Sequence, residues 1–127
     1  MTRINVVPVE ELTNMHLLGE YKEITRLPNY LKRSLNRKKP FSFDEIPSRY
    51  TLGKGHVKFF YNKMMWLQTR YVELADEMER RGMSPKRLHE HLFLSVPKKF
   101  YNDYKPDKAA MEINRERILD RLNAKEV

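Results

Sequence analysis

Three ionisable side chains at helical spacing are the first chemical feature of this sequence. His16, Glu20 and Glu23 stand at positions i, i+4 and i+7, so a helix would place an imidazole and two carboxylates within one narrow arc. Such a face can transfer protons, and with a divalent ion it could instead form a metal-dependent nuclease site. The metal hypothesis is weakened because the sequence has no second histidine at HExxH spacing and no aspartate cluster. A solvated face held by surface ion pairs is the alternative without chemistry.

The N-terminus offers a second reactive group. Met1 precedes the small residue Thr2, an order that allows methionine aminopeptidase to remove Met1 and expose the α-amine of Thr2. An α-amine has a pKa of about 7.7–8.0, so much of it is unprotonated and nucleophilic at neutral pH. A lysine amine, with a pKa of about 10.4, would first have to be desolvated. An ordinary terminus without a catalytic role is the alternative interpretation.

Basic side chains accompany these groups and indicate a polyanionic partner. The 127 residues include 25 lysines and arginines against 17 aspartates and glutamates, for a net charge of +8. Lys22 and Arg26 lie one turn apart beside the His16 face, and Arg117 and Arg121 form a second pair with the geometry of a phosphate clamp. Aromatic residues near the basic runs could stack on bases, namely Phe41, Phe43, Tyr101 and Tyr104. A basic protein with merely solvated charges is the alternative.

Composition excludes several classes of protein. With no cysteine, the chain cannot form disulfides, use a thiol nucleophile or bind metal through thiolates. There is no long apolar run, and Pro8 and Glu10-Glu11 interrupt the start, so we expect neither a signal peptide nor a membrane span. We therefore expect a cytoplasmic protein of a bacterium or phage-infected cell, folded as a single domain over residues 1–127.

Helices are predicted to position these residues. The first runs from about Val9 to about Leu35, with a bend near Pro28. Residues 41–55 are punctuated by Pro and Gly and are predicted to form a loop. A second helix follows His56 and stops at Gly82, because apolar residues repeat there at intervals of three and four. These residues are assigned to the core and are Val57, Phe60, Met64, Leu67, Tyr71, Leu74 and Met78.

The C-terminal third predicts a short helix at Lys86–Leu92, then a loop, then a third main helix from near Pro106 to about Asn123. This helix is predicted to bury Met111, Ile118, Leu119 and Leu122, and to carry Ala110, Asn114, Arg117 and Arg121 on a second face. No segment alternates at period two, so the predicted fold class is all-α, with three main helices and long connecting loops.

An ordered set of residues runs through almost the whole chain. It begins with Thr2-Arg3-Ile4-Asn5 and continues through Glu11-Leu12, His16-Leu17, Glu20-Tyr21, Glu23, Arg26, Leu52-Gly53, Gly55-His56-Val57 and Phe59-Phe60-Tyr61. It ends with Arg81-Gly82, Pro97, Phe100, Asp103-Tyr104, Pro106 and Arg117. Together these residues resemble the phage endonuclease V family of pyrimidine-dimer DNA glycosylases with abasic-site lyase activity. An ordered set of this length is much more specific than any single motif.

The resemblance implies a role for each candidate residue. The α-amine of Thr2 would attack the anomeric carbon of a damaged nucleotide, expel the base and leave a protonated Schiff base. Glu23 would stabilise positive charge on the sugar and then assist proton abstraction for β-elimination. Residues that would hold the DNA backbone and the lesion are Arg3, His16, Lys22, Arg26, Arg117 and Arg121. Lys22 stands where the family often has arginine, which keeps the charge but loses bidentate geometry.

The resemblance also implies a monomer that bends double-stranded DNA containing damaged or abasic sites and uses neither metal nor organic cofactor. Two alternatives stay open, a non-catalytic basic DNA-binding protein and a metal-dependent nuclease using His16, Glu20 and Glu23. Met15 occupies a position that is polar in the best-known phage member, and the sequence ends at Val127 without that member's aromatic, basic tail. We therefore expect abasic-site cleavage to be better retained than the preference for pyrimidine dimers.

Overall fold

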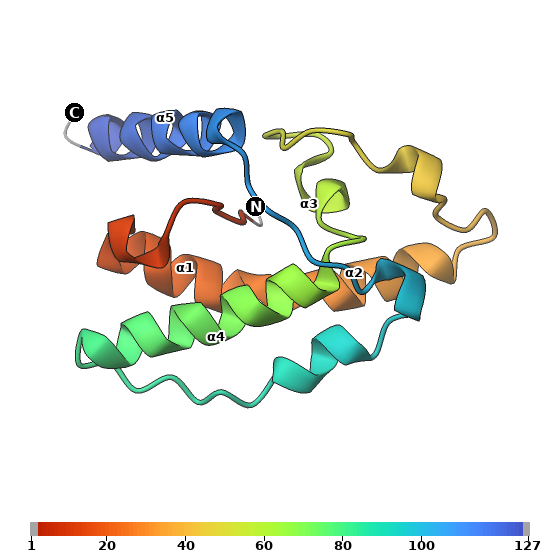
Figure 1. The fold of residues 1–127 in the computed structure, drawn as a ribbon, viewed down its shortest axis with the longest axis horizontal. Helices are drawn as coiled ribbons and strands as arrows, with labels where there is room; N and C mark the ends of the chain where they lie inside the picture. The colour runs from red at the N-terminus through yellow and green to blue at the C-terminus, as the bar shows by residue number, and fades with distance from the viewer. Residues whose placement is uncertain (1–2, 126–127) are drawn as a thin grey trace.

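Residues 3–125 are described by the computed structural model, and among them helices are connected by long loops, without any β-strand (Figure 1). The α-helices are α1 (Asn14–Ile24), α2 (Arg26–Leu35), α3 (His56–Phe59), α4 (Met64–Arg80) and α5 (Lys108–Lys125). Short 3-10 turns occupy Val9–Glu11, Phe43–Glu45, Glu90–Leu94 and Lys98–Phe100. The predicted all-α class is confirmed. Within the described range, no helix has the length and apolar character needed to cross a membrane.

The predicted first helix is divided into a 3-10 turn, α1 and α2. Helix α1 starts separately from the 3-10 turn before it, because the hydroxyl of Thr13 caps its first turn. This hydroxyl accepts the N–H of His16 at 3.3 Å. The sequence predicted a bend near Pro28, whereas the break between α1 and α2 lies at Thr25. Pro28 instead occupies the first turn of α2, where backbone N–H groups have no partner within the helix and proline is tolerated.

The predicted second helix is also divided, into α3 and α4, with a break over residues 60–63. Phe60 at this break is fully buried and packs against the rings of Phe59 and Trp66, so aromatic packing stabilises the interruption. The end of α4 is as predicted. Gly82 has φ of +87°, and the N–H of Met83 returns to the carbonyl of Met78 at 2.9 Å, which together form a Schellman cap.

The segment after α4 differs from the prediction of a short helix at Lys86–Leu92. The chain is extended up to the 3-10 turn at Glu90–Leu94, and Arg87 has φ of +55°, which no right-handed helix contains. Contacts with α4 explain this path, because the guanidinium of Arg87 pairs with Asp76 at 2.6 Å and with Glu79 at 2.9 Å. Tertiary ion pairs thus override the local helical pattern.

Helix α5 begins and ends close to the predicted positions, and two of its four predicted core residues, Met111 and Ile118, are partly buried against the core. Asp107 caps it by accepting the N–H of Ala110 at 2.7 Å. Ala110 and Asn114 are buried, whereas Leu119, which was predicted to be in the core, is 58% exposed. The reason is that α5 covers the N-terminal segment, residues 3–7. The backbone N–H groups of Val6 and Val7 in this segment require a polar acceptor, which a leucine cannot provide.

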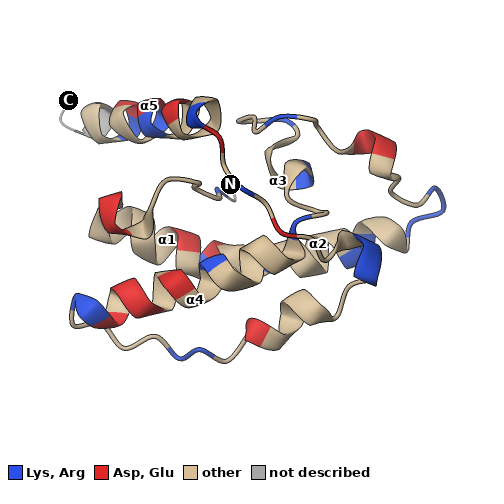
Figure 2. Ribbon diagram, viewed as in Figure 1, with Lys and Arg blue, Asp and Glu red and all other residues tan. Residues whose placement is uncertain are grey.

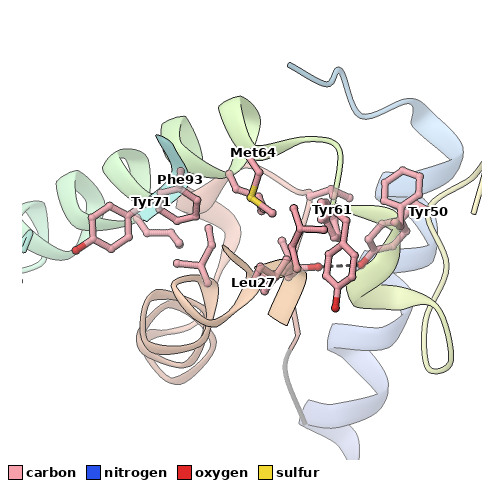
Figure 3. Close-up of a cluster of buried hydrophobic side chains, with 14 of the residues drawn as sticks. Leu27, Tyr50, Tyr61, Met64, Tyr71 and Phe93 are labelled. Carbon is pink, nitrogen blue, oxygen red and sulfur yellow. Dashed lines mark hydrogen bonds between the residues drawn. The ribbon is translucent and has the colours of Figure 1, made fainter. Parts of the chain in front are cut away.

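The hydrophobic core follows α4 and the helices beside it (Figure 3). Helix α1 packs along α4, and the 3-10 turn at Glu90–Leu94 covers α4 from another side. Figure 3 shows Tyr71 and Phe93 at one end of the cluster, Met64 between the ends, and Tyr61 and Tyr50 at the other end. The predicted core residues of α4 are all buried, namely Met64, Leu67, Tyr71, Leu74 and Met78. Ile4, Val6 and Val7 belong to the same core, so the N-terminal segment is packed into it.

Candidate functional site

The N-terminal segment, residues 3–7, runs between α5 on one side and α1 with α4 on the other (Figure 1). A buried extended segment must find partners for its backbone N–H and C=O groups. Here the partners are side chains. The N–H of Arg3 donates to Glu23 at 2.8 Å, and the N–H of Ile4 donates to His56 at 2.9 Å. Asn114 accepts the next two hydrogen bonds, from the N–H of Val6 at 2.7 Å and from that of Val7 at 3.1 Å. The carbonyls of Ile4 and Val7 accept from Tyr50 (3.2 Å) and Arg70 (2.6 Å). Residues 3–7 are therefore held in one path.

His56, at the start of α3, is one of these anchors. Its Nδ1 donates to the carbonyl of Thr51 at 2.8 Å, which leaves Nε2 as the acceptor for the N–H of Ile4. Burial lowers the pKa of His56 to about 4, although the hydrogen bond to Thr51 opposes this shift. At neutral pH the imidazole is therefore uncharged and keeps the acceptor that Ile4 needs.

Glu20 lies beneath the same segment in a buried ion pair. Its carboxylate contacts the Arg70 guanidinium at 2.7 and 3.1 Å and accepts the side-chain amide of Asn5 at 2.9 Å. Glu20 is 2% exposed and Arg70 3%. Both oxygens are thus engaged in holding the N-terminal segment. Of the three residues of the predicted acid-base face, Glu20 is thus engaged in an ion pair, and proton transfer by His16 and Glu23 stays a prediction.

The contacts of Glu20 and Glu23 argue against the alternative of a metal site. Across residues 3–125, no group of three or more histidine, aspartate and glutamate side chains is placed to hold a metal ion. The ligand set of His16, Glu20 and Glu23 is not formed, because Glu20 turns inward to Arg70 while Glu23 turns toward the start of the chain.

A hollow of about 230 Å³ opens between the N-terminal segment, α1 and α5. Many of the sequence-predicted site residues line it, namely Arg3, His16, Glu23, Arg117 and Arg121. The other lining residues are Asn5, Met15, Gly19, Glu20 and Ile118. Residues from the two ends of the described chain thus meet in one concave site.

Three arginines give this hollow a positive character. None of Arg3, Arg117 and Arg121 takes part in the ion pairs recorded within residues 3–125. Burial lowers the pKa of Arg3, and the nearby charges of Arg117 and Arg121 lower it further. The Nη1 of Arg3 and the Nε of Arg117 are buried without a hydrogen-bond partner. A stranded buried donor costs about 1–3 kcal/mol, so an anionic group entering the hollow would relieve this cost.

Glu23 lies where the described chain begins, with its Oε2 accepting the N–H of Arg3. Thr2, the predicted nucleophile, lies outside the described residues. His16 lines the hollow, with Nδ1 2.9 Å from the hydroxyl of Thr13.

Lys22 and Arg26, predicted to bind DNA, are exposed on α1 and at the start of α2 and do not line the hollow. Figure 2 shows further lysines and arginines toward the end of α2 and in the loop that follows it. Further basic residues therefore lie outside the hollow.

The four aromatic residues predicted to stack on bases pack within the protein. Phe41 is buried with its ring edge toward Tyr61, and Phe43 stacks on Phe100. Tyr104 packs against Phe59, Phe60 and Trp66, while the hydroxyl of Tyr101 donates to Gln68. Phe43 is nevertheless 39% exposed, and none of the four lines the hollow, so stacking on bases stays a prediction.

Sequence reasoning missed four residues that position the site. Asn5 and Asn114 bond to each other at 2.8 Å, and Tyr50 and Arg70 bind the backbone of the N-terminal segment. One signal for Asn114 existed, because it shares a helix face with the small Ala110 and with Arg117. Tyr50 and Arg70 carried none, since each lies more than 40 residues from its partner.

Comparison with known families gives an independent finding. The model of a family described as pyrimidine dimer DNA glycosylase matches residues 1–91. These residues include the N-terminal segment and helices α1 to α4. The match ends before α5, which supplies Asn114, Arg117 and Arg121.

Proposed function

The chain belongs to the pyrimidine dimer DNA glycosylase family, and from this premise we propose that it also cleaves the DNA strand, using the Thr2 α-amine as nucleophile and Glu23 as the acid-base group. Its substrate is DNA. The proposed lesion is the ultraviolet-induced cyclobutane dimer, and the proposed second step is lyase cleavage of the resulting abasic site.

The observation that carries this proposal is the 2.8 Å hydrogen bond between the N–H of Arg3 and the Glu23 carboxylate. Three covalent bonds separate this nitrogen from the α-nitrogen of Thr2, and standard bond lengths keep the two within about 4 Å of each other. A carboxylate that is hydrogen-bonded to the backbone nitrogen of Arg3 would therefore be close to a sugar bonded to the α-nitrogen of Thr2. The side-chain contacts of residues 4–7 keep the N–H of Arg3 at the Glu23 carboxylate, which supports the proposal.

The chemistry follows from an amine beside a carboxylate. The amine attacks C1′ of the damaged nucleotide, a C–N bond forms, and the bond between the sugar and its base breaks. Opening of the sugar ring gives a protonated imine, which acidifies the hydrogens on C2′. Glu23 then accepts one C2′ proton, and the electron pair expels the 3′ phosphate by β-elimination. Hydrolysis of the imine releases the enzyme. The imine is itself the electron sink, so we propose that neither metal nor organic cofactor takes part.

The arginines support the same function by binding the DNA backbone. Arg3, Arg117 and Arg121 suit phosphates next to the lesion, because they lack carboxylate partners within the described residues and converge on one hollow. Lys22 and Arg26, exposed nearby, suit phosphates further along the duplex. We propose that the enzyme acts as a monomer on damaged or abasic double-stranded DNA, in the cytoplasm of a bacterium or phage-infected cell.

Borohydride trapping on an abasic duplex tests the nucleophile. Protein whose N-terminus is shown by mass spectrometry to be Thr2 should form a covalent DNA adduct. Protein that is acetylated at Thr2 or retains Met1 should form none, yet should bind the duplex with little loss, because affinity comes mainly from phosphate contacts. Adduct formation by the blocked protein would show that another amine attacks. Absence of any adduct with free Thr2 would favour the non-catalytic DNA-binding alternative, and cleavage abolished by chelators would favour the nuclease.

Glu23→Gln tests the carboxylate, since the amide is nearly isosteric but neither carries the charge nor accepts the proton. Dimer cleavage should be lost and β-elimination strongly slowed, with DNA binding retained. The matched control is Glu73→Gln, a change at an exposed residue of α4 that does not line the hollow. Undiminished cleavage by Glu23→Gln would show that Glu23 has a structural role and does not take part in catalysis.

A further inference from the structure

The hollow has an apolar wall for which the chemistry above has no use. Met15 and Gly19 on α1 face it together with Ile118 on α5. Met15 is 43% exposed, so part of this apolar side chain is accessible from the hollow. Apolar surface inside a concave and otherwise charged site is typical of contact with an apolar part of a ligand.

Gly19 in this wall is not required by the packing of the protein. It lies in the interior of α1, where glycine is less favourable than alanine. A Cβ added at Gly19 would meet no protein atom within 4 Å. Met15, Gly19 and Glu23 follow one another at i, i+4 and i+8, so the bare backbone of Gly19 leaves space on the helix between the apolar side chain and the carboxylate. This opening allows a ligand to lie directly on α1.

The three parts of a nucleotide require different surroundings. The phosphate suits the arginines, and the sugar must lie at Glu23 if C1′ and C2′ are to react. The base is the part with apolar ring faces, and thymine adds an apolar 5-methyl group. Met15 and Ile118 are the large apolar side chains that line the hollow, and they line it together with the arginines and Glu23.

We propose that Met15 and Ile118 contact the damaged base and make this enzyme select pyrimidine dimers that carry 5-methyl groups. This inference rests on the proposed function of the hollow. Met15 would then be a specificity-determining residue, because it influences which dimer the enzyme cleaves faster. Burial of one methyl group changes a rate or binding constant about fourfold, so thymine dimers should be cleaved at least about fourfold faster than uracil dimers of the same stereochemistry.

The test compares single-turnover cleavage of three duplexes of one sequence, containing a cis-syn thymine dimer, a cis-syn uracil dimer or an abasic site. Enzyme is kept below saturation so that the rate reports both binding and chemistry. Wild-type protein is compared with Met15→Gln, which keeps the length of the side chain but makes its end polar. Met65→Gln is the matched control, because Met65 is 37% exposed on α4 and does not line the hollow.

Wild-type protein and Met65→Gln should both prefer the thymine dimer about fourfold or more, and Met15→Gln should bring the ratio of the two rates close to one. Equal rates on the two dimers with wild-type protein, or an unchanged ratio in Met15→Gln, would overturn the inference. The abasic duplex separates this failure from failure of the proposed function. Cleavage and borohydride trapping there show that the chemistry is intact, whereas their absence in wild-type protein would reject the proposed function itself.

Discussion

Asn114→Ala should destabilise the protein by removing the side chain that ties α5 to the N-terminal segment. Asn114 accepts the N–H groups of Val6 and Val7 at 2.7 and 3.1 Å and donates to the side-chain oxygen of Asn5 at 2.8 Å. All four residues are buried, so alanine leaves two donors and one acceptor without partners. Each such hydrogen bond contributes about 1 kcal/mol, and a stranded group costs about 1–3 kcal/mol. The expected loss is about 3 kcal/mol, a large part of the roughly 5–15 kcal/mol of a typical domain.

Urea unfolding followed by circular dichroism measures this loss, and a thermal melt should move down by about 10 °C. Asn123→Ala is the control, because Asn123 is exposed on the same helix, and it should cost less than about 0.5 kcal/mol. Asn114→Asp should fall between the two, since it keeps an acceptor for Val6 and Val7 but loses the donor to Asn5. If Asn114→Ala lies within about 1 kcal/mol of wild type, these hydrogen bonds do not hold the segment. The path of residues 3–7 would then depend on their other side-chain contacts.

Other predictions concern the ion pair, the histidine and the phosphate contacts. Glu20→Ala should cost about 3–5 kcal/mol in urea unfolding because it leaves the charge of Arg70 buried and unpaired, and a loss below 1 kcal/mol would show that water reaches this pair. Burial lowers the pKa of His56 from 6.5 to about 4, so the unfolded chain takes up the proton first. Stability should be full above about pH 6.5 and fall by about 2 kcal/mol between pH 7 and pH 4.5. His56→Gln should flatten this part of the pH curve, and an equally steep curve in that variant would assign the loss to other groups. Alanine at Arg26, Arg117 or Arg121 should lower the slope of log affinity against log salt by about one each, and a variant with an unchanged slope contacts no phosphate.

Local rules were sufficient where a segment's structure depends on its own residues. The apolar repeat of α4 and the glycine after it predicted that helix and its end, and Asp107 with the helical pattern beyond it predicted α5. The same rules misplaced the break before α2, since Pro28 is compatible with a first turn as well as with a bend. The all-α class and the resemblance of the N-terminal residues were therefore available from the sequence by itself.

Only the tertiary structure decided which residues meet in the site. Arg3 and Arg117 are far apart in the chain, and no periodicity predicts that both line one hollow with Glu23. Glu20 and Glu23 were placed on one helix face, yet one is buried against Arg70 and the other holds the N–H of Arg3. Helical spacing defines an arc of the helix but not the neighbour that each part of the arc contacts. That neighbour depends on where α4, α5 and the N-terminal segment pack, because a buried carboxylate needs a charged partner and a buried backbone N–H needs an acceptor.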